Sequence, residues 1–282
     1  MPEFLSHGKI NVGLRITGVR PDGYHTLQTV YQELSLADRI TLDPADSGWT
    51  LTSSGEEIPR GKENLAVKAY RVLKDLFPRL GGARIDLQKR IPVGTGLGGG
   101  SSNAATVLKG LNELYRLGLS PDRLEKIASR LGADVPFFIR GGTQYAEGTG
   151  DELEPAVLPP MGAIVLVVPP VRISTRWAYS QIRKALSGER NRGNFARYLK
   201  APPSWEFFEN DFESLVFPAY PEIGAIKGQL LQMGAVFASL SGSGSTVFGI
   251  FRDDIQARRV LKAFSSPFQT FLTHPKAPPI GN

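Results

Sequence analysis

The segment Ile91–Ser102 carries the residues whose types and spacing point most directly to chemistry. It reads Ile-Pro-Val-Gly-Thr-Gly-Leu-Gly-Gly-Gly-Ser-Ser, with glycine at five of the seven positions from 94 to 100. A bare backbone of this kind lets peptide N–H groups approach an anion closely. A helix that starts directly behind it adds the positive end of its dipole. A plain flexible loop is the alternative for any glycine-rich run, but the position before a helix favours a cradle for the phosphates of a nucleotide triphosphate.

The sequence on both sides of this loop predicts the elements that such a cradle needs. Ala83–Gln88 alternates between apolar and polar residues, as a strand does, and Ser101 or Ser102 is the expected N-cap of the following helix. Apolar residues recur there at helical spacing, at Ala104, Ala105, Val107, Leu108, Leu111, Leu114 and Tyr115. Strand, glycine loop and helix therefore follow one another in the order that phosphate binding requires.

Other well-known phosphate loops do not fit this segment. No Gly-Lys-Ser or Gly-Lys-Thr occurs in the chain, which excludes a Walker A loop. Gly94, Gly96 and Gly99 match the dinucleotide fingerprint literally, but the βαβαβ series of a Rossmann domain does not follow them. The His-Arg-Asp and Asp-Phe-Gly motifs of protein kinases are also missing.

Two further segments place ionisable side chains where they could act on a substrate. Asp134 lies in the small and apolar stretch Gly132–Phe138, where a charge is costly unless it is paired. Lys9 and Asn11 fall on the same face of a predicted strand, because side chains alternate. A turn aspartate and a surface pair on an edge strand are the alternatives. The functional hypothesis pairs Lys9 with Asp134, which would keep the carboxylate ionised beside a substrate hydroxyl.

A second glycine loop, Leu240–Phe248, separates two predicted strands. A hairpin turn explains it, although its small residues would also allow a ligand or another backbone to approach closely. Together, Lys9–Asn11, Pro92–Ser102 and Leu240–Thr246 resemble, in this order, the three motifs of the GHMP superfamily of small-molecule kinases.

Within that superfamily the chain resembles the 4-diphosphocytidyl-2-C-methyl-D-erythritol kinases. The similarity spans roughly residues 8 to 251 and is carried by Asp22–Thr29, Gly98–Ala105, Leu131–Pro136 and Asn210–Glu213. Asp22-Gly23-Tyr24-His25 is its most specific part, because it resembles the cytidine site of this family rather than the shared ATP loop.

The resemblance implies an α+β, two-domain GHMP kinase fold. The N-terminal domain would be ribosomal-protein-S5-domain-2-like and the C-terminal domain a ferredoxin-like α/β sandwich. The expected ranges are 1–155 for the first domain with the phosphate loop, 156–274 for the second, and 275–282 for an extended tail.

The resemblance also implies the reaction and the residues that carry it. The γ-phosphoryl group of ATP, bound with Mg²⁺, would pass to the 2-hydroxyl of 4-diphosphocytidyl-2-C-methyl-D-erythritol in the non-mevalonate route to isoprenoid precursors. Lys9 and Asp134 would be catalytic, with Asp134 as a base or a positioning carboxylate. The acceptor would be bound by Asn11, Tyr24, His25, Thr175 and Tyr179. ATP would be bound by Asn64, Pro92, Gly94, Gly96, Leu97, Gly98, Gly99, Gly100, Ser101 and Ser102, and the Ser102 hydroxyl could contribute to the Mg²⁺ shell.

Composition excludes several other classes of protein. The absence of cysteine rules out disulfides and thiolate metal sites, and three histidines without a His-Glu-x-x-His motif disfavour a zinc enzyme. No run of about 18 apolar residues occurs, and the first residues lack the basic and apolar regions of a secretory signal, so we expect a cytoplasmic protein. We expect a monomer or a weak homodimer.

The net charge of +6 is concentrated in one stretch, because residues 176–200 hold seven Lys or Arg against one acid. The rest of the chain is near neutral, which disfavours a nucleic-acid partner. The alternatives that stay open are another GHMP kinase of the homoserine or mevalonate type, and a non-catalytic nucleotide- or RNA-binding module.

Periodicity predicts the remaining elements. The expected strands are 9–16, 27–34, 39–42, 236–240 and 246–251, with a fully buried strand at 162–168. The expected helices are 64–77, 120–131, 175–185, 221–233 and 254–264, the second of them capped by Ser120.

Overall fold

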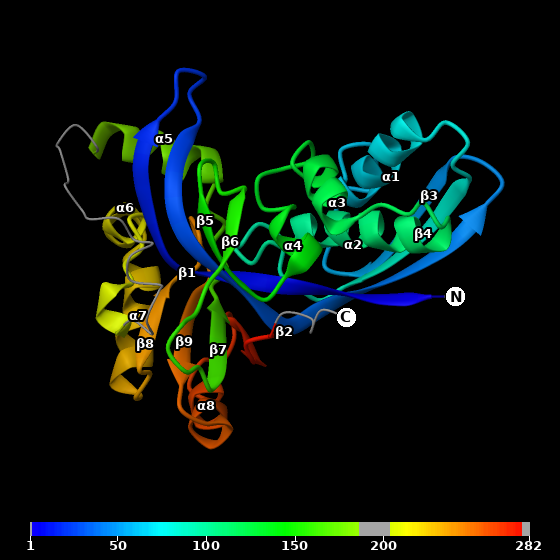
Figure 1. The fold of residues 1–282 in the computed structure, drawn as a ribbon. Helices are drawn as coiled ribbons and strands as arrows, with labels where there is room; N and C mark the ends of the chain where they lie inside the picture. The colour runs from blue at the N-terminus through cyan, green and yellow to red at the C-terminus, as the bar shows by residue number, and fades with distance from the viewer. Residues whose placement is uncertain (1, 186–203, 278–282) are drawn as a thin grey trace.

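The computed structural model describes residues 2–185 and 204–277, which form two β-sheets with helices packed against them (Figure 1). In the described residues the first sheet has six strands in the order β3-β4-β2-β5-β6, with β1 also paired to β2. They are β1 (Glu3–Val19), β2 (His25–Ala45), β3 (Trp49–Gly55), β4 (Gly82–Lys89), β5 (Thr143–Glu147) and β6 (Glu152–Pro155). The second sheet has the order β10-β7-β9-β8. Its strands are β7 (Ala163–Val168), β8 (Phe237–Leu240), β9 (Val247–Phe251) and β10 (Gln269–Thr273).

The antiparallel pair β1–β2 consists of the two longest strands of the described structure. The expected strands 27–34 and 39–42 are one continuous strand, because Ser6 pairs with Asp38 and His7 with Ala37 across the expected gap. Asp38 lies in this gap, and its buried carboxylate accepts backbone N–H groups. The prediction of two separate strands, at 27–34 and 39–42, is therefore wrong.

Four helices cover one face of the first sheet and build the first core with it. They are α1 (Leu65–Leu76), α2 (Gly99–Leu114), α3 (Pro121–Ala128) and the short α4 (Phe137–Arg140). The predicted cap of α3 is confirmed, since the Ser120 side chain accepts from the N–H of Arg123. The predicted cap of α2 is wrong: Gly98, with φ of 68°, is the N-cap, and Ser101 and Ser102 lie inside the first turn. Glycine tolerates this left-handed conformation, so the helix begins earlier than a side-chain cap would have placed it.

The second sheet is covered on both faces, which explains the apolar run in β7. Ile164 and Leu166 pack in a core shared with β1 and β2. Ala163, Val165 and Val167 face the other way, into a core with the helices of the second half. These helices are α5 (Thr175–Ala185), α6 (Glu213–Ala219), α7 (Pro221–Gln232) and α8 (Asp254–Leu261), and a 3-10 turn at Trp205–Phe207 lies between α5 and α6. The predicted buried strand is confirmed.

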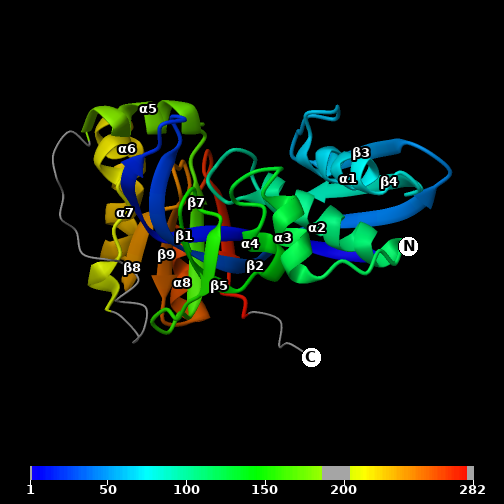
Figure 2. The same ribbon diagram turned by 45° about the horizontal axis from the view of Figure 1, so that its top comes forward.

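The β1–β2 hairpin contributes to both parts of the molecule (Figure 2). Its middle belongs to the shared core, whereas Leu14, Ile16 and Leu27 near its tip are members of the second core. The segment after β10 returns to the same hairpin, where Lys276 N donates to the Glu33 carbonyl oxygen at 2.8 Å. The expected domain boundaries near 155 and 274 stay predictions.

No helix between residues 2 and 185 or between 204 and 277 is both long and apolar enough to cross a membrane. Most of the basic stretch 176–200 lies outside the described residues.

Candidate active site

A cavity of about 1660 Å³ opens between the two parts of the molecule and gathers nearly all of the predicted site residues. Its lining includes Lys9, Asn11, Tyr24, His25, Asn64, Pro92, Gly94, Gly96, Gly98, Gly99, Gly100, Ser101, Asp134, Thr175 and Tyr179. Leu97 and Ser102 do not line it, because both side chains are buried. Residues from positions 9 to 179 thus meet around one space.

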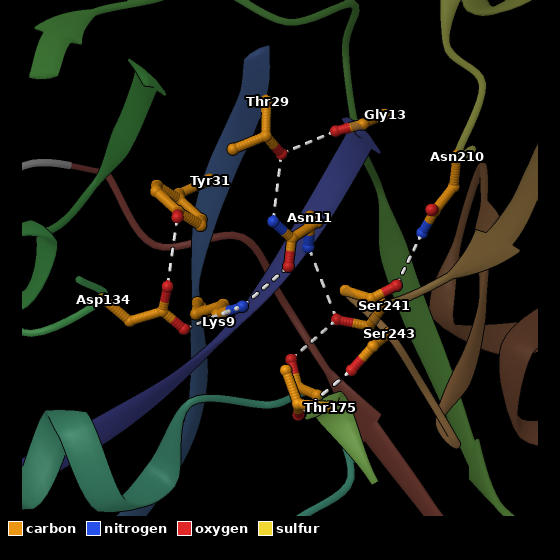
Figure 3. Close-up of polar contacts among 12 residues, drawn as sticks. Lys9, Asn11, Gly13, Thr29, Tyr31, Asp134, Thr175, Asn210, Ser241 and Ser243 are labelled. Atoms are coloured by element: carbon orange, nitrogen blue, oxygen red, sulfur yellow. Dashed lines mark hydrogen bonds and ion pairs between the residues drawn. The ribbon is translucent and has the colours of Figure 1, made fainter. Parts of the chain in front are cut away.

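Lys9 joins Asp134 to Asn11 in the lining of this cavity (Figure 3). Its Nζ lies 3.3 Å from Asp134 Oδ2 and donates to Asn11 Oδ1 at 2.6 Å. Lys9 is buried, whereas about a third of the Asp134 side chain is exposed to the cavity. The predicted pairing of Lys9 with Asp134 and the shared face of Lys9 and Asn11 are confirmed.

Irregularities in β1 set the short segment Lys9–Asn11 apart from the rest of the strand. The register with β2 shifts between His7 and Lys9 and again between Asn11 and Leu14. Bulges of this kind re-aim side chains and are common beside active sites. The segment Lys9–Asn11 is therefore a regular stretch held between two bends.

Asn11 is fixed by contacts that the sequence alone did not indicate. Its Nδ2 donates to Thr29 Oγ1 at 3.0 Å, and that hydroxyl donates to the Gly13 carbonyl at 2.6 Å. Because Thr29 lies on the neighbouring strand, only the register of β1 on β2 could have identified it.

Tyr31 is the second residue that sequence reasoning missed. Its hydroxyl donates to Asp134 Oδ1 at 3.1 Å, so the carboxylate has one partner on each oxygen. Burial, with the charge of Asp134 adding to it, raises the pKa of Tyr31 well above its ordinary value. The signal that could have found it is its register position directly opposite Asn11.

The two glycine loops pack against each other. Ser241 Oγ donates to the Gly96 carbonyl at 3.0 Å, and Thr246 N donates to the Thr95 carbonyl at 3.1 Å. Gly96 has φ of 88°, and a Cβ on it would overlap the Ser241 carbonyl oxygen. The segment 240–248 is therefore the turn of the β8–β9 hairpin and also a close support for the phosphate loop.

A buried carboxylate ties both ends of the phosphate loop to β2. Asp38 Oδ1 accepts from the N–H groups of Arg90 and Ile91 at 2.7 and 2.8 Å. Its Oδ2 accepts from Asn103 Nδ2 at 2.9 Å and pairs with Lys89. Burial lowers the pKa of Lys89, and the nearby Asp38 charge opposes that shift. This support under the loop was not predicted from the sequence.

Aromatic rings gather at the other end of the cavity. The rings of His25 and Tyr179 are 4.9 Å apart between centroids, and Tyr179 also meets Phe212 edge-on at 4.9 Å. Tyr24 is 67% exposed near the tip of the β1–β2 hairpin. Thr175 Oγ1 lies 3.3 Å from Ser243 Oγ. The structure thus brings His25, Thr175 and Tyr179 to one end of the cavity, and Tyr24 stays open to solvent.

Two predicted ATP residues have structural partners of their own. Asn64 caps α1, since its Oδ1 accepts from Ala66 N at 2.9 Å, and it also lines the cavity. Ser102 is 2% exposed and its hydroxyl accepts from Ser6 Oγ at 2.8 Å. The Ser102 hydroxyl thus faces the protein interior, whereas Ser101 lines the cavity, and a contribution of Ser102 to a Mg²⁺ shell stays a prediction.

Comparison with known proteins places this geometry in a family. The family model of the GHMP kinases N terminal domain matches residues 64–142, and that of the GHMP kinases C terminal domain matches residues 185–270. A 4-diphosphocytidyl-2-C-methyl-D-erythritol kinase from Prosthecochloris aestuarii is 41% identical over 273 residues, which is 95% of each chain.

Solved structures agree with this relationship. A crystal structure of 4-(cytidine 5'-diphospho)-2C-methyl-D-erythritol kinase superposes with a TM-score of 0.83 at 35% identity, covering 98% of this chain and all of the other. A homoserine kinase from Cytophaga hutchinsonii, at 17% identity and a TM-score of 0.68 over 95% of this chain and 94% of its own, shares the fold alone. The predicted α+β two-domain fold is confirmed, and the chain belongs to the GHMP kinases and, within them, to the family of the 4-diphosphocytidyl-2-C-methyl-D-erythritol kinases.

Proposed function

We propose that this kinase transfers the γ-phosphoryl group of ATP to the 2-hydroxyl of 4-diphosphocytidyl-2-C-methyl-D-erythritol, a step of the non-mevalonate route to isoprenoid precursors. The names of its relatives support this acceptor. The observation that carries the proposal is the ion pair of Lys9 with Asp134, which lies between the phosphate loop and the aromatic end of one cavity.

Phosphoryl transfer demands positioning and charge neutralisation more than covalent chemistry. The backbone of Gly94–Ser101 and the N-terminus of α2 would hold the phosphates, since they offer N–H donors and a positive dipole end. Asp134 would accept the proton of the acceptor hydroxyl or orient that hydroxyl toward the phosphorus. Lys9 would keep Asp134 ionised and offset the charge that develops on the transferred group.

The described residues are compatible with Mg²⁺ that arrives with the nucleotide. They contain no group of three His, Cys, Asp or Glu side chains that could cage a metal. Mg²⁺ usually keeps several waters and binds through substrate phosphates with one or two carboxylates. When bound it would neutralise phosphate charge, and Asp134 and Asp151 are carboxylates that line the cavity.

The aromatic end of the cavity supports a cytidine-bearing acceptor over a smaller one. Tyr24, His25 and Tyr179 offer ring faces to a base, whereas homoserine or mevalonate has no ring to stack. Asn11 and Thr175 would hold the methylerythritol end. We propose a monomer or a weak homodimer.

An ATP-consumption assay with purified protein tests the acceptor. Four acceptors are compared at equal concentration: 4-diphosphocytidyl-2-C-methyl-D-erythritol, homoserine, mevalonate and galactose. We expect turnover with the first and background with the others. Equal or faster turnover with homoserine or mevalonate would move the chain to another GHMP activity, and binding of ATP without any turnover would favour a non-catalytic nucleotide-binding module.

A further inference from the structure

The two oxygens of the Asp134 carboxylate have different partners (Figure 3). Lys9 Nζ approaches Oδ2 at 3.3 Å, and the Tyr31 hydroxyl donates to Oδ1 at 3.1 Å. Lys9 supplies charge, while Tyr31 supplies a directed neutral donor. Hydrogen bonds to an ionised acceptor are stronger than those between neutral groups.

The Tyr31 ring is held firmly enough to aim its hydroxyl. It is 2% exposed and packs against Phe137 with centroids 5.0 Å apart. Lys9 Nζ lies 5.2 Å from its centroid. Tyr31 lies on β2 directly opposite Asn11, so its side chain is on the same face of the sheet as Lys9 and Asn11.

The hydroxyl of Tyr31 stays a donor over the whole working range of pH. Burial, followed by the Asp134 charge, raises the pKa of Tyr31 well above its ordinary value. The ion pair with Lys9 alone would leave the carboxylate free to rotate about its terminal bond, because an ammonium group is a point charge without a fixed direction.

We propose that Tyr31 is a positioning residue for phosphoryl transfer that acts through Asp134. Its hydroxyl fixes Oδ1, so that the carboxylate keeps its orientation when the acceptor hydroxyl arrives. This inference rests on the proposed function, because it assigns Asp134 to the reacting hydroxyl. The titratable groups that surround the Asp134–Tyr31 contact from other elements are Lys9 on β1, Asp151 in the turn after β5 and Tyr179 on α5.

Tyr31→Phe tests the proposal, since it removes one hydroxyl and keeps the ring that packs on Phe137. We expect kcat to fall roughly 10- to 100-fold, the effect of losing one hydrogen bond to a charged group. The KM for the acceptor should change much less than kcat, because the contact orients Asp134 rather than the acceptor itself. The KM for ATP should stay within about threefold.

Tyr145→Phe is the matched control. Tyr145 is also buried, on β5, and its hydroxyl bonds to Glu147. It pairs with Val30 and packs in the shared core, on the opposite face of the sheet from Tyr31. It does not line the cavity. This variant loses the same atom, and we expect it to keep the wild-type kcat even where its melting temperature falls.

Two results would overturn the role of Tyr31. One is a folded Tyr31→Phe enzyme with the wild-type kcat. The other is a loss of kcat that follows the melting temperature equally in both variants, which would make the hydroxyl merely structural.

A second measurement separates this inference from the choice of acceptor. The ¹³C carboxyl chemical shift of Asp134, identified by its loss in Asp134→Asn, reports on hydrogen bonds to that carboxylate and can be recorded at neutral pH without any acceptor. A chemical shift that changes in Tyr31→Phe but not in Tyr145→Phe supports the contact even if none of the four acceptors is phosphorylated. An unchanged chemical shift overturns the inference while leaving an observed kinase activity intact.

Discussion

The Asp134 side chain is partly open to the cavity and yet held on both oxygens, by Lys9 and by Tyr31. A carboxylate held in this way has a defined direction before a substrate binds. Preorganisation of this kind is a large part of what an enzyme contributes to a reaction that develops charge.

Asp134→Asn keeps the size of the side chain and removes its charge and basicity. We expect kcat to fall at least ~10²-fold, the lower end for a positioned acid–base group, with the KM for ATP little changed. Asp86→Asn, at an exposed carboxylate on β4, is the control and should keep the wild-type kcat. A folded Asp134→Asn enzyme with normal turnover would remove Asp134 from the chemistry.

Tyr179 tests the cytidine end of the cavity. Base–aromatic stacking contributes about 1–3 kcal/mol, so Tyr179→Ala should raise the KM for the acceptor by roughly 5- to 150-fold. The KM for ATP should stay within about threefold, because the phosphate loop lies at the other end of the cavity. Tyr179→Phe should be mild, since the ring face remains.

The contrary outcome for Tyr179 is also specific. The ring packs on His25 and Phe212, so it could serve the second core only. In that case Tyr179→Ala would lower the melting temperature and leave the acceptor KM of the folded protein unchanged.

Sequence reasoning succeeded for residues with a local signature and failed for those defined by a neighbour in space. Lys9 and Asp134 were paired correctly because a lysine on a strand face and an aspartate in an apolar stretch are unusual where they stand. Thr29, Tyr31 and Asp38 are ordinary residues of an alternating strand. Their roles come from the register of β2 on β1 and from the approach of the phosphate loop, which no local pattern encodes.

At the scale of elements, the phosphate loop is a short connection with supports on two sides. Asp38 binds its two ends to β2, and the β8–β9 turn packs on its middle. Gly96 cannot accept a side chain without displacing that turn. The loop is therefore held in place from two sides, while its outer surface stays open to the cavity.

Gly100→Val adds bulk on that open surface. Beyond its own helix and chain neighbours, a Cβ at Gly100 would meet Leu65 Cδ1, at 3.7 Å, among the described residues, so the fold should tolerate the change. We expect the KM for ATP to rise at least about tenfold, the effect of weakening one charge-assisted hydrogen bond to phosphate. Calorimetry of ATP binding measures it directly.

Gly228→Val on α7 is the matched control for this loop. Within the described part of the chain, nothing beyond its own helix and chain neighbours lies within 4 Å of a Cβ there, and the residue is outside the cavity lining. It should leave ATP affinity unchanged. Unchanged affinity in Gly100→Val as well would mean that the loop is only a connection.

Strong periodicity identified most helices and the buried strand β7, whereas short or exposed elements were missed. The strands β3, β5, β6 and β10 and the helices α4 and α6 carry too few residues or too little contrast for a periodic signal. They are stabilised by pairing with strands distant in sequence, as β10 is by β7.

At the scale of the whole molecule, several tyrosines are removed from water. Burial raises the pKa of Tyr31, Tyr145 and Tyr179 above the ordinary value, with Asp134 or Glu147 adding to the effect. For an acid with a raised pKa in the folded state, the stability that its neutral form contributes is present below the unfolded pKa, about 10, and is lost as pH rises above it.

We therefore expect the melting temperature to be steady up to about pH 9.5 and to fall steeply above about pH 10. Phenolate absorbance at 295 nm should rise in part with unfolding rather than ahead of it. Tyr145→Phe should lessen the alkaline loss. A protein whose tyrosines all ionise reversibly near pH 10 at constant melting temperature would contradict this account.

The β1–β2 hairpin, which supplies residues to the second core as well as to the first sheet, has a consequence for biosynthesis. Its last residue, Ala45, leaves the ribosome 118 residues before β7 begins at Ala163. At translation rates of about 5–20 residues per second, the apolar face of the hairpin stays uncovered for roughly 6 to 24 s, until the strands that cover it are synthesised. The nascent chain thus exposes a long hairpin with an uncovered apolar face for longer than most small domains take to fold. The two sheets also cannot be expressed as separate halves, because the second would lack Leu14, Ile16 and Leu27 from its interior.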